Sequence, residues 1–80
     1  MKYVIVNHKG RELPIVFDGI FDHSSMVRNY DTDDIVSAGF VDIFSSGMNC
    51  VSVFCYGKSV SLKVTSREEK DSELIKKSLE

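Results

Sequence analysis

The segment from Ile35 to Val64 constrains the fold most, because it is rich in β-branched and aromatic residues and only turn-forming residues interrupt it. Side chains of these kinds pack well on a pleated, half-buried surface and therefore favour strands. We expect this segment to form the centre of one sheet, around which the rest of the chain packs.

Side-chain alternation divides this segment into strands. The runs 51–55 and 58–65 alternate between apolar and polar residues, which is typical of a strand with one face in solvent. The run 35–45 is largely apolar at both alternating sets of positions, so we predict that it is the central strand. Gly39 interrupts it and indicates a bulge or a close approach of another backbone. Turns are predicted at 45–49 and at 56–59.

The N-terminal third predicts a hairpin and a short helix. The runs 2–7 and 12–17 are both rich in strand-forming residues and flank a turn that contains glycine, so they should pair. Pro14 has no amide hydrogen, so we expect the second strand either to lie at an edge of the sheet, where a partner could dock, or to carry its proline on the solvent side. Residues 25–30 predict a helix of two turns at most.

The C-terminal segment carries the clearest helix signal. Ser66 and Glu69 have the spacing of a capping box, in which each side chain accepts a hydrogen bond from the other residue's backbone N–H. Acidic residues near the start and Lys76 and Lys77 near the end suit the helix dipole. Few of the residues are apolar, so we expect a narrow contact with one face of the sheet.

These elements predict a single α+β domain over residues 1–80. Their order is ββαβββα, with an antiparallel sheet of about five strands and helices packed on one face. A chain of 80 residues buries only roughly 60% of its unfolded surface, so stabilisation by a partner or a second copy would matter. A homodimer formed through a sheet edge is one such arrangement.

Charge, hydropathy and cysteine positions limit the class of protein. The net charge of −2 does not favour nucleic acid as a partner. The apolar N-terminal run stops at Asn7, which is too short for a signal peptide or a membrane span, so we expect a cytoplasmic protein with no membrane partner. Cys50 and Cys55 fall on opposite faces of one predicted strand and cannot bridge each other, so we expect free, buried thiols.

Histidine and cysteine supply candidate ligands and nucleophiles without a supporting pattern. His8 and His23 with the two cysteines lack the paired spacing of a zinc site. A nucleophilic Cys55 activated by His23 lacks a recognisable third group and an oxyanion loop. We predict no metal, no cofactor and no catalytic residue.

Two loops resemble ligand-binding motifs only in part. The acidic turn 31–34 has Val36 and Asp42 where a calcium loop needs glycine and glutamate. The run Gly57-Lys58-Ser59 lacks the first glycine of a phosphate-binding loop and leads into a strand instead of a helix. A binding surface for a partner remains as the functional prediction. Its candidate residues are Asp31, Asp33, Asp34, Tyr56, Lys58 and Ser59.

Three runs resemble a group of small, mostly uncharacterised proteins encoded by phages and prophages. They are Ser37 to Val41, Cys55 to Leu62, and Ser66 to Asp71. The resemblance spans roughly residues 35–76 and transfers no catalytic role to any position. It implies a phage accessory protein, a class in which small domains often bind and block a host protein such as a defence nuclease complex.

The function predicted from these observations is protein binding by a non-enzymatic phage or prophage accessory protein. Inhibition of a host defence system, as anti-CRISPR proteins achieve, is the form that the resemblance implies. The alternatives are a small nucleic-acid-binding protein and a structural or assembly protein of a phage particle. The acidic turn weakens the nucleic-acid alternative, although an acidic surface could also imitate a nucleic-acid backbone.

Overall fold

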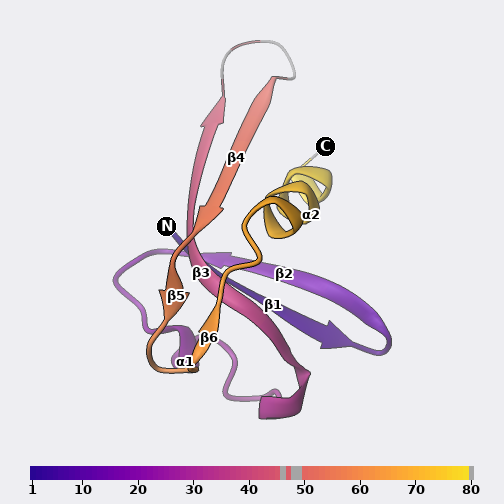
Figure 1. Cartoon of the computed structure of the whole chain (residues 1–80), viewed down its shortest axis with the longest axis vertical. Coiled ribbons are helices and arrows are strands. Elements are labelled where there is room, and N and C mark those ends of the chain that lie inside the picture. The colour runs from indigo at the N-terminus through magenta and orange to yellow at the C-terminus, as the bar shows by residue number, and fades with distance from the viewer. Residues whose placement is uncertain (46, 48–49, 80) are drawn as a thin grey trace.

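The computed structural model describes residues 1–45, 47 and 50–79, apart from the side chain of Thr32. Within these residues, six strands, two α-helices and one 3-10 turn follow one another (Figure 1). They are β1 (Lys2–His8), β2 (Arg11–Phe17), α1 (His23–Met26), η1 (Thr32–Asp34), β3 (Ile35–Ser45), β4 (Val51–Tyr56), β5 (Lys58–Ser59), β6 (Val64–Thr65) and α2 (Glu69–Leu79).

The strands form two antiparallel sheets. The larger has the order β2-β1-β3-β4, and the smaller consists of β5 and β6. The predicted α+β class is confirmed. The predicted sheet of about five strands differs in detail, because the last two strands form a separate small sheet instead of extending the first.

Strand β3 joins the two halves of the larger sheet. Its first part, Ile35 to Phe40, pairs with β1, and its second part, Phe40 to Ser45, pairs with β4. The second part of β3 and all of β4 thus form an arm that extends away from the β1–β2 hairpin (Figure 1). The prediction that 35–45 is a central strand is confirmed. Of the predicted turn at 45–49, residues 46, 48 and 49 lie outside the described residues.

Strand β2 lies at the edge of the larger sheet, as its proline predicted. Pro14 is opposite Ile5 of β1 in a hairpin whose register runs from Lys2↔Phe17 to His8↔Arg11. The predicted pairing of the first two strands is therefore confirmed. An edge position tolerates proline because the missing N–H would have pointed away from β1.

Both faces of the larger sheet are covered at β1. Tyr3 and Ile5 pack against Ile75 of α2, whereas Val4 and Val6 pack against Val27, which follows α1. The two helices therefore lie on opposite faces, and the prediction that they share one face is wrong. The four β1 residues from Tyr3 to Val6 are all fully buried, so each face needs its own cover.

The predicted strand at 58–65 is replaced by a tight hairpin. Strand β5 ends at Ser59, the chain turns, and β6 begins at Val64. The Ser59 hydroxyl accepts a hydrogen bond from the Leu62 N–H at 3.2 Å, which stabilises the turn. Val60 is consequently 79% exposed instead of facing a core. The alternation of Val60, Leu62 and Val64 with polar residues wrongly predicted one strand, because residues 60–63 form the turn between β5 and β6.

Both helices start differently from their predictions. Helix α1 covers His23–Met26, earlier and shorter than the predicted 25–30. At α2 the capping box is not formed, because the Ser66 N–H donates to the Gly57 carbonyl at 3.0 Å and is not free for Glu69. The Ser66 hydroxyl instead accepts from the Glu68 N–H at 3.0 Å.

A buried carboxylate fastens α2 to the sheet. Asp71 is fully buried, and its Oδ2 accepts hydrogen bonds from the Tyr3 hydroxyl at 2.6 Å and from the Arg67 N–H at 2.9 Å. Its Oδ1 accepts from Arg67 Nε at 2.8 Å. The same guanidinium pairs with Glu12 of β2 at 2.7 Å. One network therefore joins α2 to β1 and β2.

This network sets the ionisation of its members. Burial alone would raise the pKa of Asp71, but the hydrogen bonds from Tyr3 and from the Arg67 backbone outweigh burial and hold the pKa below its ordinary value. Burial and the neighbouring Asp71 carboxylate raise the pKa of the Tyr3 hydroxyl above its ordinary value. Asp71 is therefore a carboxylate, and Tyr3 is a neutral donor.

Gly39 of β3 lies beside two other segments of the chain, the end of β4 at Tyr56 and the residue Ser66 before α2. A Cβ at this position would lie 2.5 Å from the Tyr56 carbonyl oxygen and 3.2 Å from the Ser66 Cβ. Of the two predicted roles for Gly39, close backbone approach is the one observed. The register shift in β3 pairing occurs elsewhere, opposite Ile5 and Val6.

We expect Gly39→Ala to lower the free energy of unfolding by about 1–3 kcal/mol, because the new methyl group overlaps a backbone oxygen that cannot move independently. Gly19→Ala is the matched control, since nothing lies within 4 Å of a Cβ there, and it should change stability by less than about 1 kcal/mol. Urea denaturation measures both. Equal stability of the two variants would contradict the close approach.

We expect Tyr3→Phe to cost about 1–3 kcal/mol of stability, because it removes one of the hydrogen-bond donors that compensate the buried Asp71 carboxylate and leaves the Arg67 donors alone. Tyr56→Phe removes the same hydroxyl from a side chain that is 45% exposed and should cost less than about 0.5 kcal/mol. Thermal unfolding of both variants measures the difference in stability cost between the two positions. A Tyr3→Phe variant as stable as the wild type would exclude the network as the anchor of α2.

Acid should weaken this anchor. A carboxyl group whose folded pKa is lowered contributes stability above its unfolded pKa, here about 3.8, and loses it as the pH falls through the lower folded value. The free energy of unfolding should therefore fall as the pH drops below about 4. Urea denaturation between pH 6 and pH 2.5 should give a shallower acid slope for Asp71→Asn, and an unchanged slope for the exposed control Asp33→Asn.

Candidate functional site

The β3–β4 arm presents aromatic side chains on one face. Antiparallel pairing places Phe40 opposite Tyr56 and Asp42 opposite Phe54, and Phe44 lies two residues further along β3. Residues two apart in a strand share a face, so these five side chains project from the same side of the arm. We call the four rings, Phe40, Phe44, Phe54 and Tyr56, the aromatic face.

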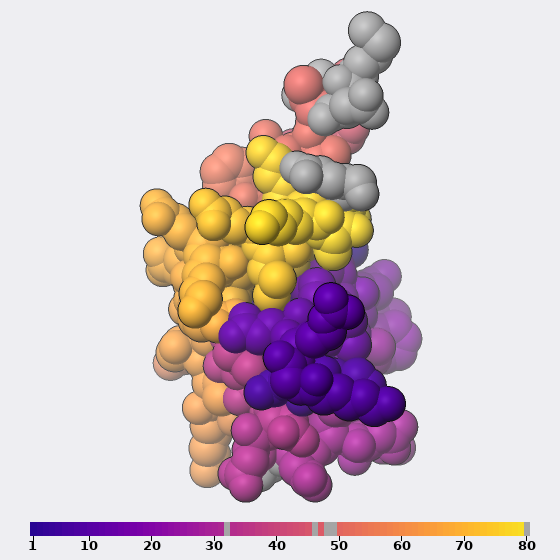
Figure 2. Space-filling view, turned by 90° about the vertical axis from the view of Figure 1, so that its right-hand side faces the viewer, coloured from indigo at the N-terminus to yellow at the C-terminus, as the bar shows by residue number. Residues whose placement is uncertain are grey.

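The opposite face of the arm is the one that α2 covers. Val41, Val53 and Cys55 pack there with Ile75 of the helix. In Figure 2 the arm rises beyond α2, which lies against the middle of the molecule. The helix therefore shields one side of the arm and leaves the aromatic face in solvent.

The rings of the aromatic face contact one another in pairs. Phe40 and Tyr56 stack with centroids 5.8 Å apart, and Phe44 meets Phe54 edge-on at 6.1 Å. Such cross-strand pairs stabilise a hairpin, which is a sufficient structural reason for two aromatic pairs. Even so, Phe44 and Phe54 remain 57% exposed. Four half-exposed rings leave roughly 300–500 Å² of apolar surface, comparable with the largest patches of monomeric proteins, which are often functional.

Asp42 lies in the middle of this apolar surface. It has Phe40 and Phe44 on either side along β3 and Phe54 across the strand pair. Its Oδ1 is 3.5 Å from the Tyr56 hydroxyl, which is long for a hydrogen bond. Within the described part of the chain, no Lys, Arg or His nitrogen forms a salt bridge with Asp42. The aromatic face thus carries one negative charge that the described residues do not neutralise.

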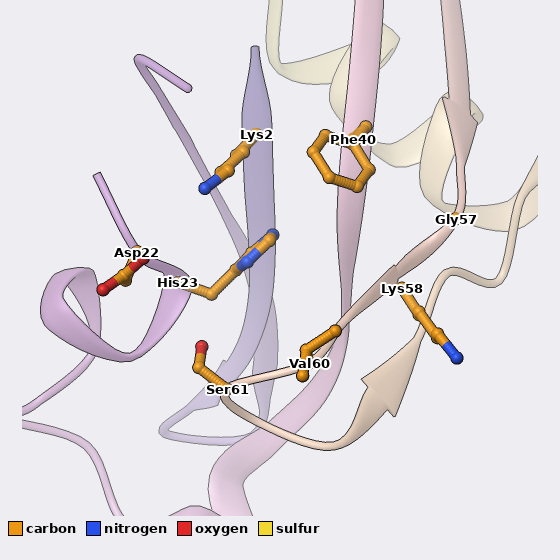
Figure 3. Close-up of a pocket in the computed structure, with 8 residues that line it drawn as sticks. All are labelled: Lys2, Asp22, His23, Phe40, Gly57, Lys58, Val60 and Ser61. Carbon is orange, nitrogen blue, oxygen red and sulfur yellow. The ribbon is translucent and has the colours of Figure 1, made fainter. Parts of the chain in front are cut away.

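A hollow of about 560 Å³ adjoins the aromatic face at Phe40 (Figure 3). Strand β1, helix α1 and the β5–β6 hairpin contribute its other walls. The lining residues are Lys2, Asp22, His23, Phe40, Gly57, Lys58, Val60 and Ser61.

His23 forms one wall of this hollow and is held there by its contacts with β3 and β2. Its side chain is only 4% exposed, and its Nε2 lies 2.8 Å from the Gly39 carbonyl oxygen. A carbonyl oxygen only accepts, so Nε2 carries a proton and donates. The ring also contacts Phe17 and Phe40 edge-on. These contacts hold His23 in place as a wall of the hollow.

The charges at the hollow have mixed signs. The Lys2 ammonium donates to the Phe21 carbonyl at 2.9 Å, and Asp22 lies on the same side of the hollow (Figure 3). The Lys58 side chain points away from Asp22 in this view. Most of the exposed surface that lines the hollow is apolar, so an apolar side chain of a partner fits it better than a strongly charged ligand does.

Cys55 and His23 do not form a catalytic pair. Cys55 is buried on the face that α2 covers, with Tyr3 and Ile75, whereas His23 contacts Phe17 and Phe40 on the other face. Burial raises the pKa of the Cys55 thiol, which makes it a poorer nucleophile. Both cysteines are free, but Cys50 is exposed, so the prediction that it is buried is wrong. Among the described residues, no group of three or more His, Cys, Asp or Glu side chains could hold a metal ion.

The structure separates the predicted binding residues. Tyr56 belongs to the aromatic face and Lys58 lines the hollow, so these two lie near each other. Ser59 is 1% exposed, and its hydroxyl accepts a hydrogen bond within the β5–β6 turn, so its side chain lies below the surface. The acidic turn, with Asp31, Asp33 and Asp34, precedes β3 at the end away from the arm.

The residues predicted to bind a partner did not include Phe40, Asp42, Phe44 and Phe54. Their signal was present, because the three β3 residues have the i, i+2, i+4 spacing of one strand face. The run 35–45 was interpreted as apolar on both faces, so the sequence did not indicate which face would stay in solvent. The position of α2, which covers the face with Val41, shows that the face with Phe40 and Phe44 does.

The edge at β2, which was predicted as a docking place, and the opposite edge at β4 are both partly closed. Pro14 interrupts β2, and Glu12 of the same strand pairs with Arg67. On β4 the Cys55 N–H donates to the Ser72 hydroxyl of α2 at 2.9 Å. These features oppose the addition of a strand at either edge. The homodimer through a sheet edge stays a prediction.

No protein-family model, curated protein or solved structure matches this chain. The resemblance to phage-encoded proteins and the functions that it implies therefore stay predictions. Among the described helices, none has the length and apolar character needed to cross a membrane.

Proposed function

We propose that this chain is a non-enzymatic protein-binding module that contacts its partner through the aromatic face and the adjoining hollow. The observation that carries the proposal is the exposure of the four rings on a face that α2 does not cover and that His23 of α1 contacts at Phe40. Aromatic residues of this kind dominate the energetics of protein interfaces when a partner buries them. The arm also extends away from the β1–β2 hairpin, which separates most of this face from the base of the sheet (Figure 1).

A small nucleic-acid-binding protein is the second candidate, because rings on an open sheet face can stack on unpaired bases. Lys2 and Lys58 lie near one end of the aromatic face and favour this alternative. Asp42 within the face and the net charge of −2 oppose it, since binding of single strands depends on a positive groove along the phosphates. We therefore rank protein binding first.

A host defence protein is the partner that the phage resemblance implies, and a component of a phage particle is the alternative. Neither identity follows from the aromatic face, which requires only a partner with a complementary surface.

The experiment is a partner capture followed by measured affinity. We expect Phe44→Ala with Phe54→Ala to weaken partner binding at least tenfold in calorimetry, because two exposed anchors are lost. Leu79→Ala is the control, since this α2 side chain is 49% exposed and lies outside the aromatic face. It should bind as the wild type does, and thermal unfolding should show that all variants fold.

Two outcomes would contradict the proposal. In the first, the double variant binds the captured protein as tightly as the wild type. In the second, the wild type binds a fluorescent single-stranded oligonucleotide at physiological salt and the double variant does not, which would favour the nucleic-acid alternative.

A further inference from the structure

We propose that Asp42 and the rings around it form a subsite for a cationic side chain of the partner, arginine in particular. This inference rests on the proposed function, because it specifies what the partner must present to the aromatic face. It follows from the position of one carboxylate within an apolar surface.

The first step concerns the cost of covering Asp42. Its neighbours on the face are Phe40, Phe44 and Phe54, and the Tyr56 hydroxyl at 3.5 Å is at best a weak donor. A partner that covers these rings also removes the water that solvates the carboxylate. A purely apolar partner would leave a buried charge without compensation, which is strongly unfavourable. The partner must therefore bring a positive charge or several donors to this point.

The second step concerns the kind of cation. A guanidinium group is planar, stacks on aromatic rings and donates two parallel hydrogen bonds to one carboxylate. The arrangement around Asp42 offers both contacts, because Phe54 lies directly across the strand pair and Phe40 lies two residues away. A cation paired with Asp42 comes within cation–π range of these rings. A lysine ammonium forms the charge pair but stacks less well.

The third step excludes two other occupants of the face. In a symmetric dimer centred on Asp42, the carboxylates of the two copies would meet and repel each other. A nucleic-acid strand would bring phosphates toward the same negative charge. A basic protein surface is the occupant that the charge of this face favours.

The test uses two tripeptides that differ only in charge, acetyl-Leu-Arg-Leu-amide and its citrulline analogue. Each is titrated into the full chain while amide and aromatic NMR shifts are recorded. We expect the arginine peptide to shift Phe40, Phe54 and Tyr56 and to bind at least fivefold more tightly than the citrulline peptide. Asp42→Asn should abolish this difference, and Asp33→Asn, the matched exposed control, should preserve it.

Three outcomes overturn the inference. One is equal affinity of the two peptides for the aromatic face, and another is a shift pattern for the arginine peptide centred on residues 31–34. The third is a dimer in sedimentation velocity that Phe54→Ala dissociates, which would make a second copy the occupant.

The captured partner separates this inference from the proposed function. Loss of binding in the Phe44→Ala, Phe54→Ala variant with normal binding of both Asp42→Asn and Asp42→Arg supports the function and overturns the cation subsite. Normal binding of the aromatic variant overturns the function, whereas the tripeptide titration still decides whether Asp42 binds a cation.

Discussion

The hydrogen bond from the Tyr3 hydroxyl to the buried Asp71 carboxylate is the interaction on which the arrangement of this molecule depends. It joins the first strand to the last helix, and Arg67 extends the connection to Glu12 on the edge strand. A buried carboxylate is tolerable only when donors surround it, so helix α2 has one position in which Asp71 is satisfied. That position lies on the face of the sheet that contains Tyr3 and Ile75.

The position of α2 has a direct consequence for the arm. The helix covers Val53 and Cys55 on one side of β4. On the other face of the sheet, α1 contacts β1 and the β5–β6 hairpin contacts β3. The aromatic side of the arm therefore stays largely in solvent, and His23 of α1 contacts it at Phe40. The contact between Tyr3 and Asp71, which positions α2, thus determines which side chains of the arm stay in solvent.

The aromatic face combines two properties that act in different ways. Its rings supply apolar area, which provides affinity but little discrimination between partners. Asp42 supplies one charge within that area, and a partner that fails to pair with it is penalised. In the binding mode that we propose, selectivity therefore depends more on this one carboxylate than on the larger area of the rings.

Sequence by itself determined the local elements of this protein. Alternation, glycine turns and proline predicted the β1–β2 hairpin, the central strand 35–45 and the edge position of Pro14, because these depend on backbone geometry that a few neighbouring residues set. It misjudged the run 58–65, where Ser59 stabilises a turn, and the capping box, where the Gly57 carbonyl takes the Ser66 N–H. Only the tertiary structure decided that the two helices lie on opposite faces and that Phe40, Asp42, Phe44 and Phe54 stay uncovered. The physical reason is that the face of a strand that stays in solvent depends on where distant elements pack, and here contacts between residues 3 and 71 determine that placement.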